Sequence, residues 1–259
     1  MSRLLEAFKH KPIFMPYYPV GYPDIESSID VLEALAKNGA DLIEIGFSFS
    51  DPLADGPIIQ KATQIALENG VTTQKVISTV AELRKRGVVI PLIMMGYFNP
   101  ILSYGVENFI QDARTAGADG FIIPDLPPEE ADEFTDALGD LPLIRMLAPT
   151  SPDDRIEKIA RTARGFIYLV SVTGVTGART TIPNELGNLV DRIRLHTRLP
   201  ICVGFGIGTP EQAKIVGKLA DGIIVGSACV RIIGASPNPV EAARELAISF
   251  STALKELKY

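Results

Sequence analysis

The stretch Ala36-Lys37-Asn38-Gly39-Ala40-Asp41-Leu42-Ile43 has the form of a helix end followed directly by a buried strand. Its glycine can stop a helix, an acid follows, and a continuous apolar run then begins. Weaker versions of this pattern recur at residues 116–123, 163–168 and 220–225. The repeat therefore predicts a chain of alternating helices and parallel strands.

Apolar runs of strand length occur eight times, at residues 13–17, 42–46, 91–96, 120–124, 143–147, 166–171, 201–203 and 222–225. Between them lie helical patterns with N-terminal signals, such as Asp24 before apolar residues at helical spacing. Eight strand–helix units predict an α/β protein, a single-domain (β/α)8 TIM barrel over residues 1–259 with an extra N-terminal helix. The alternative is an open doubly wound sheet. It is disfavoured because the late stretch Gly204-Phe205-Gly206-Ile207-Gly208-Thr209 lacks the third glycine of a dinucleotide-binding motif.

The composition excludes several classes of partner. The chain has 259 residues, of which 46% are hydrophobic, and a formal charge of −6, which argues against binding to nucleic acid. Its apolar runs fall short of the roughly 20 residues that a membrane span needs. Cys202 and Cys229 lie in or beside apolar stretches, and the N-terminus has no targeting pattern. We therefore expect reduced cysteines and a cytoplasmic protein, or one in an equivalent stroma-like compartment.

One predicted strand contains a carboxylate, Glu44, and the loop after it carries Asp51 and Asp55. Burying a polar group without a partner costs roughly 2–7 kcal/mol, and burying a charge costs more. Glu44 therefore either finds a partner at the strand end or has a raised pKa that suits acid–base catalysis. The residue alone leaves both interpretations open.

In a barrel of this kind, catalytic groups lie at the carboxyl ends of the strands. The polar residues there are Asp55 after the second strand, Asp125 after the fourth and Tyr168 in the sixth. Gly206 and the pair Gly226-Ser227 follow the last two strands, where backbone N–H groups and a helix start can bind phosphate. Tight turns are the alternative role of these glycines. An aromatic lining is available from Phe14, Tyr17, Tyr97, Tyr168 and Phe205, although such residues can also serve packing alone.

Other chemistries are not supported by the residues. His10 and His196 lie away from the strand ends, so neither a metal site nor a Ser-His-Asp triad can be assembled from them. A Walker motif is absent from the sequence. Carboxylate acid–base chemistry on a phosphorylated small molecule, without a metal, is the remaining prediction.

Four motifs closely resemble the alpha subunit family of tryptophan synthase: Ile43-Glu44-Ile45-Gly46, Phe49-Ser50-Asp51-Pro52-Leu53-Ala54-Asp55-Gly56-Pro57, Gly174-Val175-Thr176-Gly177 and Gly204-Phe205-Gly206-Ile207. The resemblance runs in order from about Ile13 to the last predicted helix. It implies the retro-aldol cleavage of indole-3-glycerol phosphate to indole and glyceraldehyde 3-phosphate in tryptophan biosynthesis. It also implies no cofactor in this chain, and a beta subunit that uses pyridoxal phosphate and forms an alpha2-beta2 heterotetramer.

The resemblance assigns roles to individual residues. Glu44 matches the general acid–base carboxylate, and Asp55 matches the acid that binds the indole N–H. The residues that match phosphate contacts are Gly177, Gly206, Gly226 and Ser227. The expected pocket and loop residues are Tyr97, Asp125, Tyr168, Thr176 and Phe205, with Thr176 on a loop that closes over the site.

The expected contact with the beta subunit involves Asp51 and its neighbours. Ser48 stands where the family usually has proline, which bears on partner coupling but leaves both catalytic acids unchanged. Two alternatives therefore stay open: a freestanding indole-3-glycerol phosphate lyase, and a catalytically weak subunit that activates its beta partner.

Overall fold

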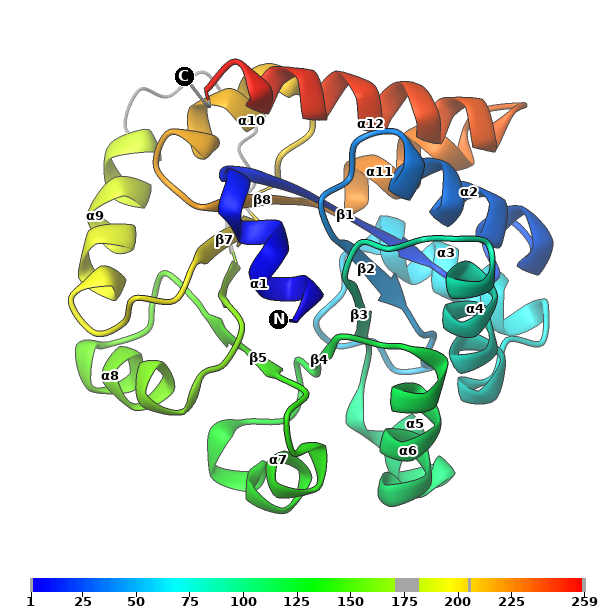
Figure 1. Cartoon of the computed structure of the whole chain (residues 1–259), viewed down its shortest axis with the longest axis horizontal. Helices are drawn as coiled ribbons and strands as arrows, with labels where there is room; N and C mark the ends of the chain where they lie inside the picture. Colours follow the sequence, from blue (N-terminus) through cyan, green and yellow to red (C-terminus); the bar gives the residue numbers. More distant parts are fainter. Residues whose placement is uncertain (1, 171–181, 205, 258–259) are drawn as a thin grey trace.

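The computed structural model describes residues 2–170, 182–204 and 206–257, without the side chains of 182–184. Its strands form a closed parallel barrel in chain order (Figure 1). They are β1 (Ile13–Pro19), β2 (Ile43–Gly46), β3 (Leu92–Met95), β4 (Gly120–Ile122), β5 (Leu143–Leu147), β6 (Ile167–Val170), β7 (Ile201–Gly204) and β8 (Gly222–Val225). The predicted barrel is thus confirmed, and the open-sheet alternative is wrong because β8 pairs with β1.

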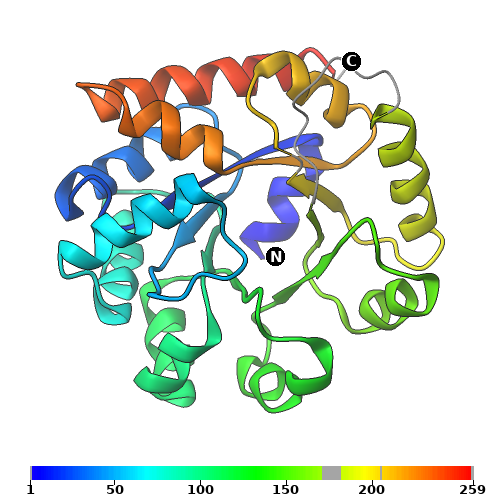
Figure 2. The same cartoon turned by 180° about the vertical axis from the view of Figure 1, so that it is seen from behind.

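Helices surround the barrel on all sides (Figures 1 and 2). The described helices are α1 (Arg3–Ala7), η1 (Phe8–His10), α2 (Ile25–Lys37), α3 (Pro57–Glu68), α4 (Thr73–Lys85), α5 (Phe98–Tyr104), α6 (Val106–Ala116), η2 (Pro128–Glu130), α7 (Asp132–Leu138), α8 (Asp153–Thr162), α9 (Ile182–Arg194), α10 (Pro210–Gly217), α11 (Ser227–Gly234) and α12 (Pro239–Lys255). The predicted cap at Asp24 is confirmed, since its carboxylate accepts a hydrogen bond from Ser27 N at 2.8 Å.

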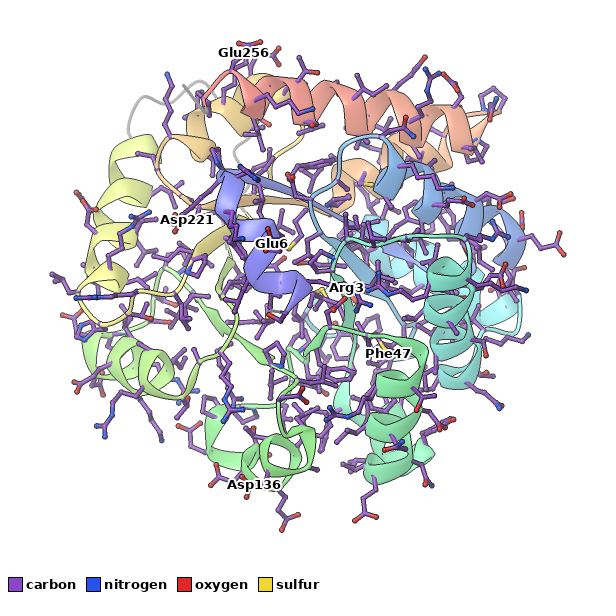
Figure 3. The ribbon with its side chains drawn as sticks, in the orientation of Figure 1. Arg3, Glu6, Phe47, Asp136, Asp221 and Glu256 are labelled. Atoms are coloured by element: carbon purple, nitrogen blue, oxygen red, sulfur yellow. The ribbon has the colours of Figure 1, made fainter. Side chains whose placement is uncertain are left out.

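The extra N-terminal helix α1 closes the amino end of the barrel. Leu4 and Phe8 are buried against the barrel interior, and the Phe8 ring centroid lies 5.7 Å from that of Phe166. Arg3 donates to Asp119, which directly precedes β4, so α1 lies where the strands begin. In Figure 3, Arg3 and Glu6 are labelled on this helix, and Asp221 lies beside it. The carboxyl ends of the strands, on the opposite face, are therefore free of α1.

The acid of the sequence repeat has a structural role at this amino end. Three even-numbered strands are each preceded by an acid, namely Asp41, Asp119 or Asp221. The carboxylate of each acid accepts a hydrogen bond from a backbone N–H of the strand that comes before it in the chain. The three donors are Phe14 N at 2.8 Å, Leu92 N at 2.9 Å and Ile201 N at 3.0 Å. The backbone N–H of each acid donates back to the carbonyl of the same residue. The repeat therefore ties neighbouring strands together in pairs, and the fourth copy has Arg164 at this position.

We expect Asp221→Asn to destabilise the fold. Asp221 also accepts from Lys11 Nζ at 2.7 Å and from Arg194 at 3.4 Å, so the substitution removes a charge that three donors share. The expected loss is about 1–3 kcal/mol in the free energy of unfolding, measured by urea denaturation. Asp136→Asn, at an exposed position on α7, is the control and should change stability by less than about 0.5 kcal/mol. Equal stability of the two variants would contradict the structural role of Asp221.

Candidate active site

Glu44 is fully buried in the middle of the barrel wall. It lies on β2 between Tyr17 of β1 and Ile93 of β3, and its side chain shares the inner face with Gly46, the last residue of the strand. Neither carboxylate oxygen has a hydrogen-bond partner among the described residues. Burial raises the pKa of Glu44 well above its usual value. The structure therefore favours the acid–base interpretation over that of a hydrogen-bonded strand-end acid.

Asp55 lies on the loop between β2 and α3, and its side chain is half-buried. Burial raises the pKa of Asp55, while a hydrogen bond with the Tyr97 side chain acts in the opposite direction. The Tyr97 hydroxyl also accepts a hydrogen bond from Ala54 N at 2.9 Å. Tyr97 thus holds both the carboxylate of Asp55 and the backbone before it, but it is not among the described residues that line the cavity at the strand ends, so its contact with the substrate stays a prediction.

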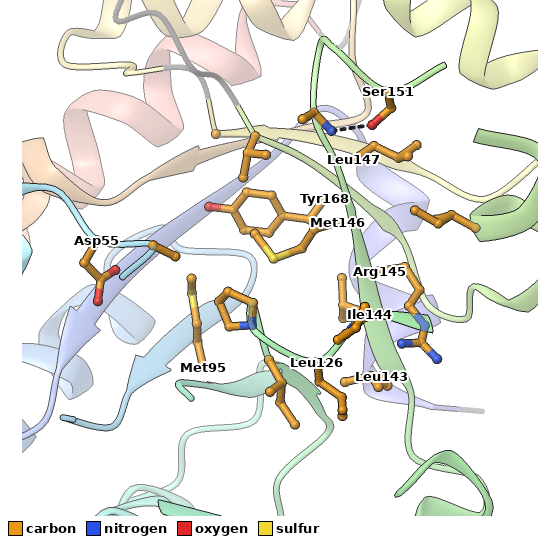
Figure 4. Close-up of a pocket in the computed structure, with 18 of the residues that line it drawn as sticks. Asp55, Met95, Leu126, Leu143, Ile144, Arg145, Met146, Leu147, Ser151 and Tyr168 are labelled. Carbon is orange, nitrogen blue, oxygen red and sulfur yellow. Dashed lines mark hydrogen bonds between the residues drawn. The ribbon is translucent and has the colours of Figure 1, made fainter. Parts of the chain in front are cut away.

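A cavity of about 700 Å³ opens at the carboxyl ends of the strands (Figure 4). Its lining includes Tyr168 within β6 and Gly204 at the end of β7, together with residues that follow the second, seventh and eighth strands, namely Asp55, Gly206 and Ser227. Four residues that the sequence predicted from separate motifs are therefore brought to one cavity. Glu44 lies two residues below Gly46, and its charge raises the pKa values of the Tyr17 and Tyr168 phenols in addition to the larger effect of burial.

Tyr17 lies close enough to Asp55 and Glu44 for both acids to raise the pKa of its phenol, after the larger effect of burial. Its hydroxyl lies over Gly46, where an added Cβ would stand 2.4 Å from the Tyr17 oxygen. Tyr168 lies in the same way over Gly204, where an added Cβ would stand 2.8 Å from the Tyr168 oxygen. A tyrosine on one strand thus occupies the space above a glycine at the end of the next strand. The sequence signal for this arrangement is the glycine that ends each of these two strands.

Phe14 does not contribute to the lining. Its ring stacks on Phe250 of α12, with a centroid distance of 5.3 Å, and therefore packs between the barrel and the helices. The expectation that Phe14 lines the pocket is wrong because its side chain points to the outer face of β1.

The expected phosphate corner is partly described. Gly206 adopts a φ of +63°, a left-handed conformation that favours glycine, and Ser227 is the first residue of α11. The first N–H groups of this helix lack partners within the helix and can bind an anion. Gly226 precedes the helix, and an added Cβ there would meet its nearest atom at 3.7 Å, so packing alone does not require glycine. The expected contacts Gly177, Thr176 and Phe205 lie outside the described residues.

Comparison with known proteins identifies the family. The family model for the tryptophan synthase alpha chain matches residues 5–258. The chain belongs to the tryptophan synthase alpha chain family. Its curated relatives include the alpha chain of Dehalococcoides mccartyi, which is 50% identical over 240 residues, or 92% of this chain and 94% of the relative. The alpha chain of a Roseiflexus species is 47% identical over 262 residues, covering 98% and 100%.

Solved structures of tryptophan synthase alpha chains have the same fold. An alpha chain from Legionella pneumophila superposes with a TM-score of 0.90 at 35% identity, covering 99% of this chain and 98% of that one. A chain of Mycobacterium tuberculosis tryptophan synthase also gives 0.90 at 35% identity, covering 98% of both chains. The assignment confirms the predicted family and the predicted activity class, a carbon–carbon lyase of tryptophan biosynthesis. An alpha chain implies a beta chain as its partner.

Asp125 has a local role in this alpha chain. Its carboxylate accepts a bifurcated hydrogen bond from Phe98 N, with the two oxygens at 2.9 and 3.2 Å, and thereby caps the start of α5. Its neighbours Pro124 and Leu126 line the cavity, but Asp125 is not among the lining residues that the structure describes. A contact between Asp125 and the substrate stays a prediction.

The loop expected to face the beta chain lies on the rim of the barrel. Ser48 lines a second cavity, of about 540 Å³, and its buried hydroxyl has no hydrogen-bond partner among the described residues. Asp51 is exposed and accepts a hydrogen bond from the Ser50 hydroxyl at 2.6 Å. Leu53 on the same loop is 92% exposed. An apolar side chain that is this exposed to solvent is typical of a protein contact surface. The contact with the beta chain stays a prediction.

The described residues contain no group of three or more His, Cys, Asp or Glu side chains that could hold a metal ion. Within the same residues, none of the helices is long and apolar enough to cross a membrane.

Proposed function

We propose that this alpha chain cleaves indole-3-glycerol phosphate into indole and glyceraldehyde 3-phosphate with Glu44 and Asp55 as its catalytic acids. The reaction adds a proton to the ring carbon that bears the glycerol chain and removes one from the adjacent hydroxyl. The observation that carries the proposal is that two carboxyl groups with raised pKa values lie on one strand and the loop after it: Asp55 lines the cavity, and Glu44 lies on β2 below the lining residues.

Glu44 is the proton carrier. Since burial without a hydrogen-bond partner favours its neutral form, Glu44 can keep a proton at higher pH than an exposed glutamate and donate it to the ring. The resulting carboxylate can then accept the proton of the hydroxyl as the C–C bond breaks. The indole ring accepts the electron pair, so the two acids suffice for the chemistry.

Asp55 binds the indole N–H and stabilises the positive charge that develops on the ring. Its hydrogen bond with Tyr97 lowers its pKa against the effect of burial and so favours the carboxylate that this role requires. Tyr168, which lines the cavity, and Tyr97, which holds Asp55, contact the indole ring, and Thr176 is a further contact.

The phosphate end of the substrate binds at Gly206, Gly226 and Ser227, with Gly177 as a further contact. We expect Ser227→Glu to raise the Ki of the inhibitor glycerol 3-phosphate by at least about tenfold, because it places a negative charge beside the dianion. Ser227→Ala is the control, since it keeps the backbone N–H groups that bind the anion, and its Ki should stay within about threefold of the parent value. An unchanged Ki in Ser227→Glu, or phosphate bound elsewhere in a crystal structure, would contradict this assignment.

The partner is a beta chain that holds pyridoxal phosphate and receives the indole, in an alpha2-beta2 heterotetramer in the cytoplasm or an equivalent compartment. Ser48 and Asp51 contribute to the contact, and their exposed neighbour Leu53 supplies apolar surface. This chain itself binds no cofactor and acts as one barrel domain.

Release of indole from indole-3-glycerol phosphate, measured with and without an added beta chain, tests the function directly. We expect turnover by the alpha chain alone and strong activation by the beta chain. Full activity without the partner would identify a freestanding lyase. Failure to release indole under both conditions would contradict the proposed reaction, and activation of the beta chain alone would identify a catalytically weak activating subunit.

A further inference from the structure

The barrel is closed, but the pairing between β4 and β5 is short. These two strands pair only at Phe121–Leu143 and Ile122–Ile144, whereas β5 continues to Leu147 and keeps pairing with β6. Pro124 stands where β4 would continue, and proline has no N–H for the ladder. The wall therefore has a gap at its carboxyl end, on one side of the active-site cavity.

The cavity passes through this gap to the outer side of β5. Its lining includes the inward-facing Ile144 and Met146 and also residues of the opposite face, Arg145 and Leu147. Figure 4 shows Arg145 and Met146 leaving β5 on opposite sides, with Asp55 and Tyr168 on the side of Met146. We call the part beyond β5 the outer chamber. Its apolar lining residues are Leu126, Leu143, Leu147 and Ile159, and its cationic ones are Arg145 and Arg155.

Arg145 lacks an anionic partner in the described structure. It is only 6% exposed, and among the described residues its guanidinium donates a single hydrogen bond, a long one from Nη2 to the Thr135 hydroxyl at 3.3 Å. Nε and Nη1 have no hydrogen-bond partner in the part of the chain that the structure describes. A carboxylate binds a guanidinium along the Nε–Nη2 or the Nη1–Nη2 edge, so either edge contains one free donor. Burying a guanidinium whose donors are unpaired costs free energy of folding unless an anion binds to it.

The neighbouring acids do not supply this anion. Glu129 of η2 is shared by Arg155 and by Lys158, whose Nζ lies 2.6 Å from a Glu129 oxygen. These ion pairs tie η2 to α8 beside the outer chamber. Asp132 lies near enough to act electrostatically on Arg145, yet it forms no ion pair with Arg145 in the described residues. Arg155 thus has an anionic partner in Glu129, whereas Arg145 forms no ion pair with any described residue.

We infer that the outer chamber is a second ligand site, which binds a small carboxylate with an apolar body, such as an aromatic acid, on Arg145. The leucine and isoleucine side chains would bury the apolar body, and the guanidinium would bind the carboxylate along one edge. The site is separate from Glu44, Asp55 and the phosphate corner, and it is joined to the active-site cavity through the gap between β4 and β5. A ligand held here would contact the wall of the indole pocket without occupying it.

Benzoate and its uncharged analogue benzamide test the inference by isothermal titration calorimetry on the full chain. We expect benzoate to bind at least about tenfold more tightly than benzamide, and Arg145→Met to remove that preference. Arg155→Met is the matched control, because Arg155 lines the same chamber but already has an anionic partner, and it should change the Kd of benzoate by less than about threefold. A crystal structure should place the carboxylate on Arg145.

Three outcomes would overturn the inference: equal binding of benzoate and benzamide, unchanged benzoate binding in Arg145→Met, or benzoate seated in the barrel mouth against Asp55 and Tyr168. Should Arg145→Met fail to fold, the comparison of the two probes on the parent protein still decides the question. Since neither probe reports on indole release, the result is independent of the proposed lyase activity.

Discussion

Glu44→Gln is expected to lower the kcat for indole release by roughly 10²–10⁴-fold, the usual contribution of a positioned acid or base. Glutamine fills the same buried space between Tyr17 and Ile93 but can neither give nor take the proton. The KM should change little, because Glu44 lies below the residues that line the cavity. Steady-state kinetics of both proteins measure the effect. An unchanged rate would show that another group carries the proton.

The same variant tests the protonation state of Glu44 in the folded protein. Because its pKa is raised by burial, the folded chain keeps the proton at pH values where the unfolded chain loses it. The stability that Glu44 contributes is therefore fully present below the unfolded pKa, near 4.3, and is lost as the pH rises toward the folded pKa. We expect Glu44→Gln to become more stable relative to the parent as the pH rises from about 5 to about 8 in urea denaturation. Parallel pH profiles would contradict a raised pKa.

Asp55→Asn is expected to lower the kcat by about 10²–10³-fold, because it removes the negative charge that faces the developing charge on the indole ring. The melting temperature should stay close to that of the parent protein, since Asp55 is half-buried on a loop and the backbone bond from Ala54 N to Tyr97 is kept. Single-turnover kinetics with a thermal melt measure both quantities.

Two comparisons separate a catalytic from a structural role of Asp55. Tyr97→Phe removes the hydrogen bond that lowers the pKa of Asp55, so the acidic limb of its pH–rate profile should move to higher pH. Asp136→Asn, which changes an exposed acid far along the chain, should leave the rate unchanged. A large fall in the melting temperature of Asp55→Asn would instead identify Asp55 as a structural residue.

The order of elements was readable from the sequence because each strand–helix unit has its own local signals. The alternation of apolar runs and capped helices predicted the closed barrel, and the long motif around Asp51 and Asp55 predicted the family. The strand that begins at Gly120 was predicted to reach Pro124 but ends at Ile122. The missing N–H of Pro124 explains this difference, although only the pairing with β5 reveals that it opens the wall.

Glu44, Asp55, Gly206 and Ser227 could be assigned to one end of the barrel from the sequence, since the carboxyl ends of parallel strands share one face. Which of these side chains share a cavity, and which residues cover them, depends on neighbours from other strands. The position of Tyr17 over Gly46, the packing of Phe14 on Phe250 and the capping of α5 by Asp125 all join residues that are distant in the chain. Local signals determined the barrel and its catalytic end, whereas burial and long-range contacts decided the pKa of Glu44 and left Arg145 without an anion.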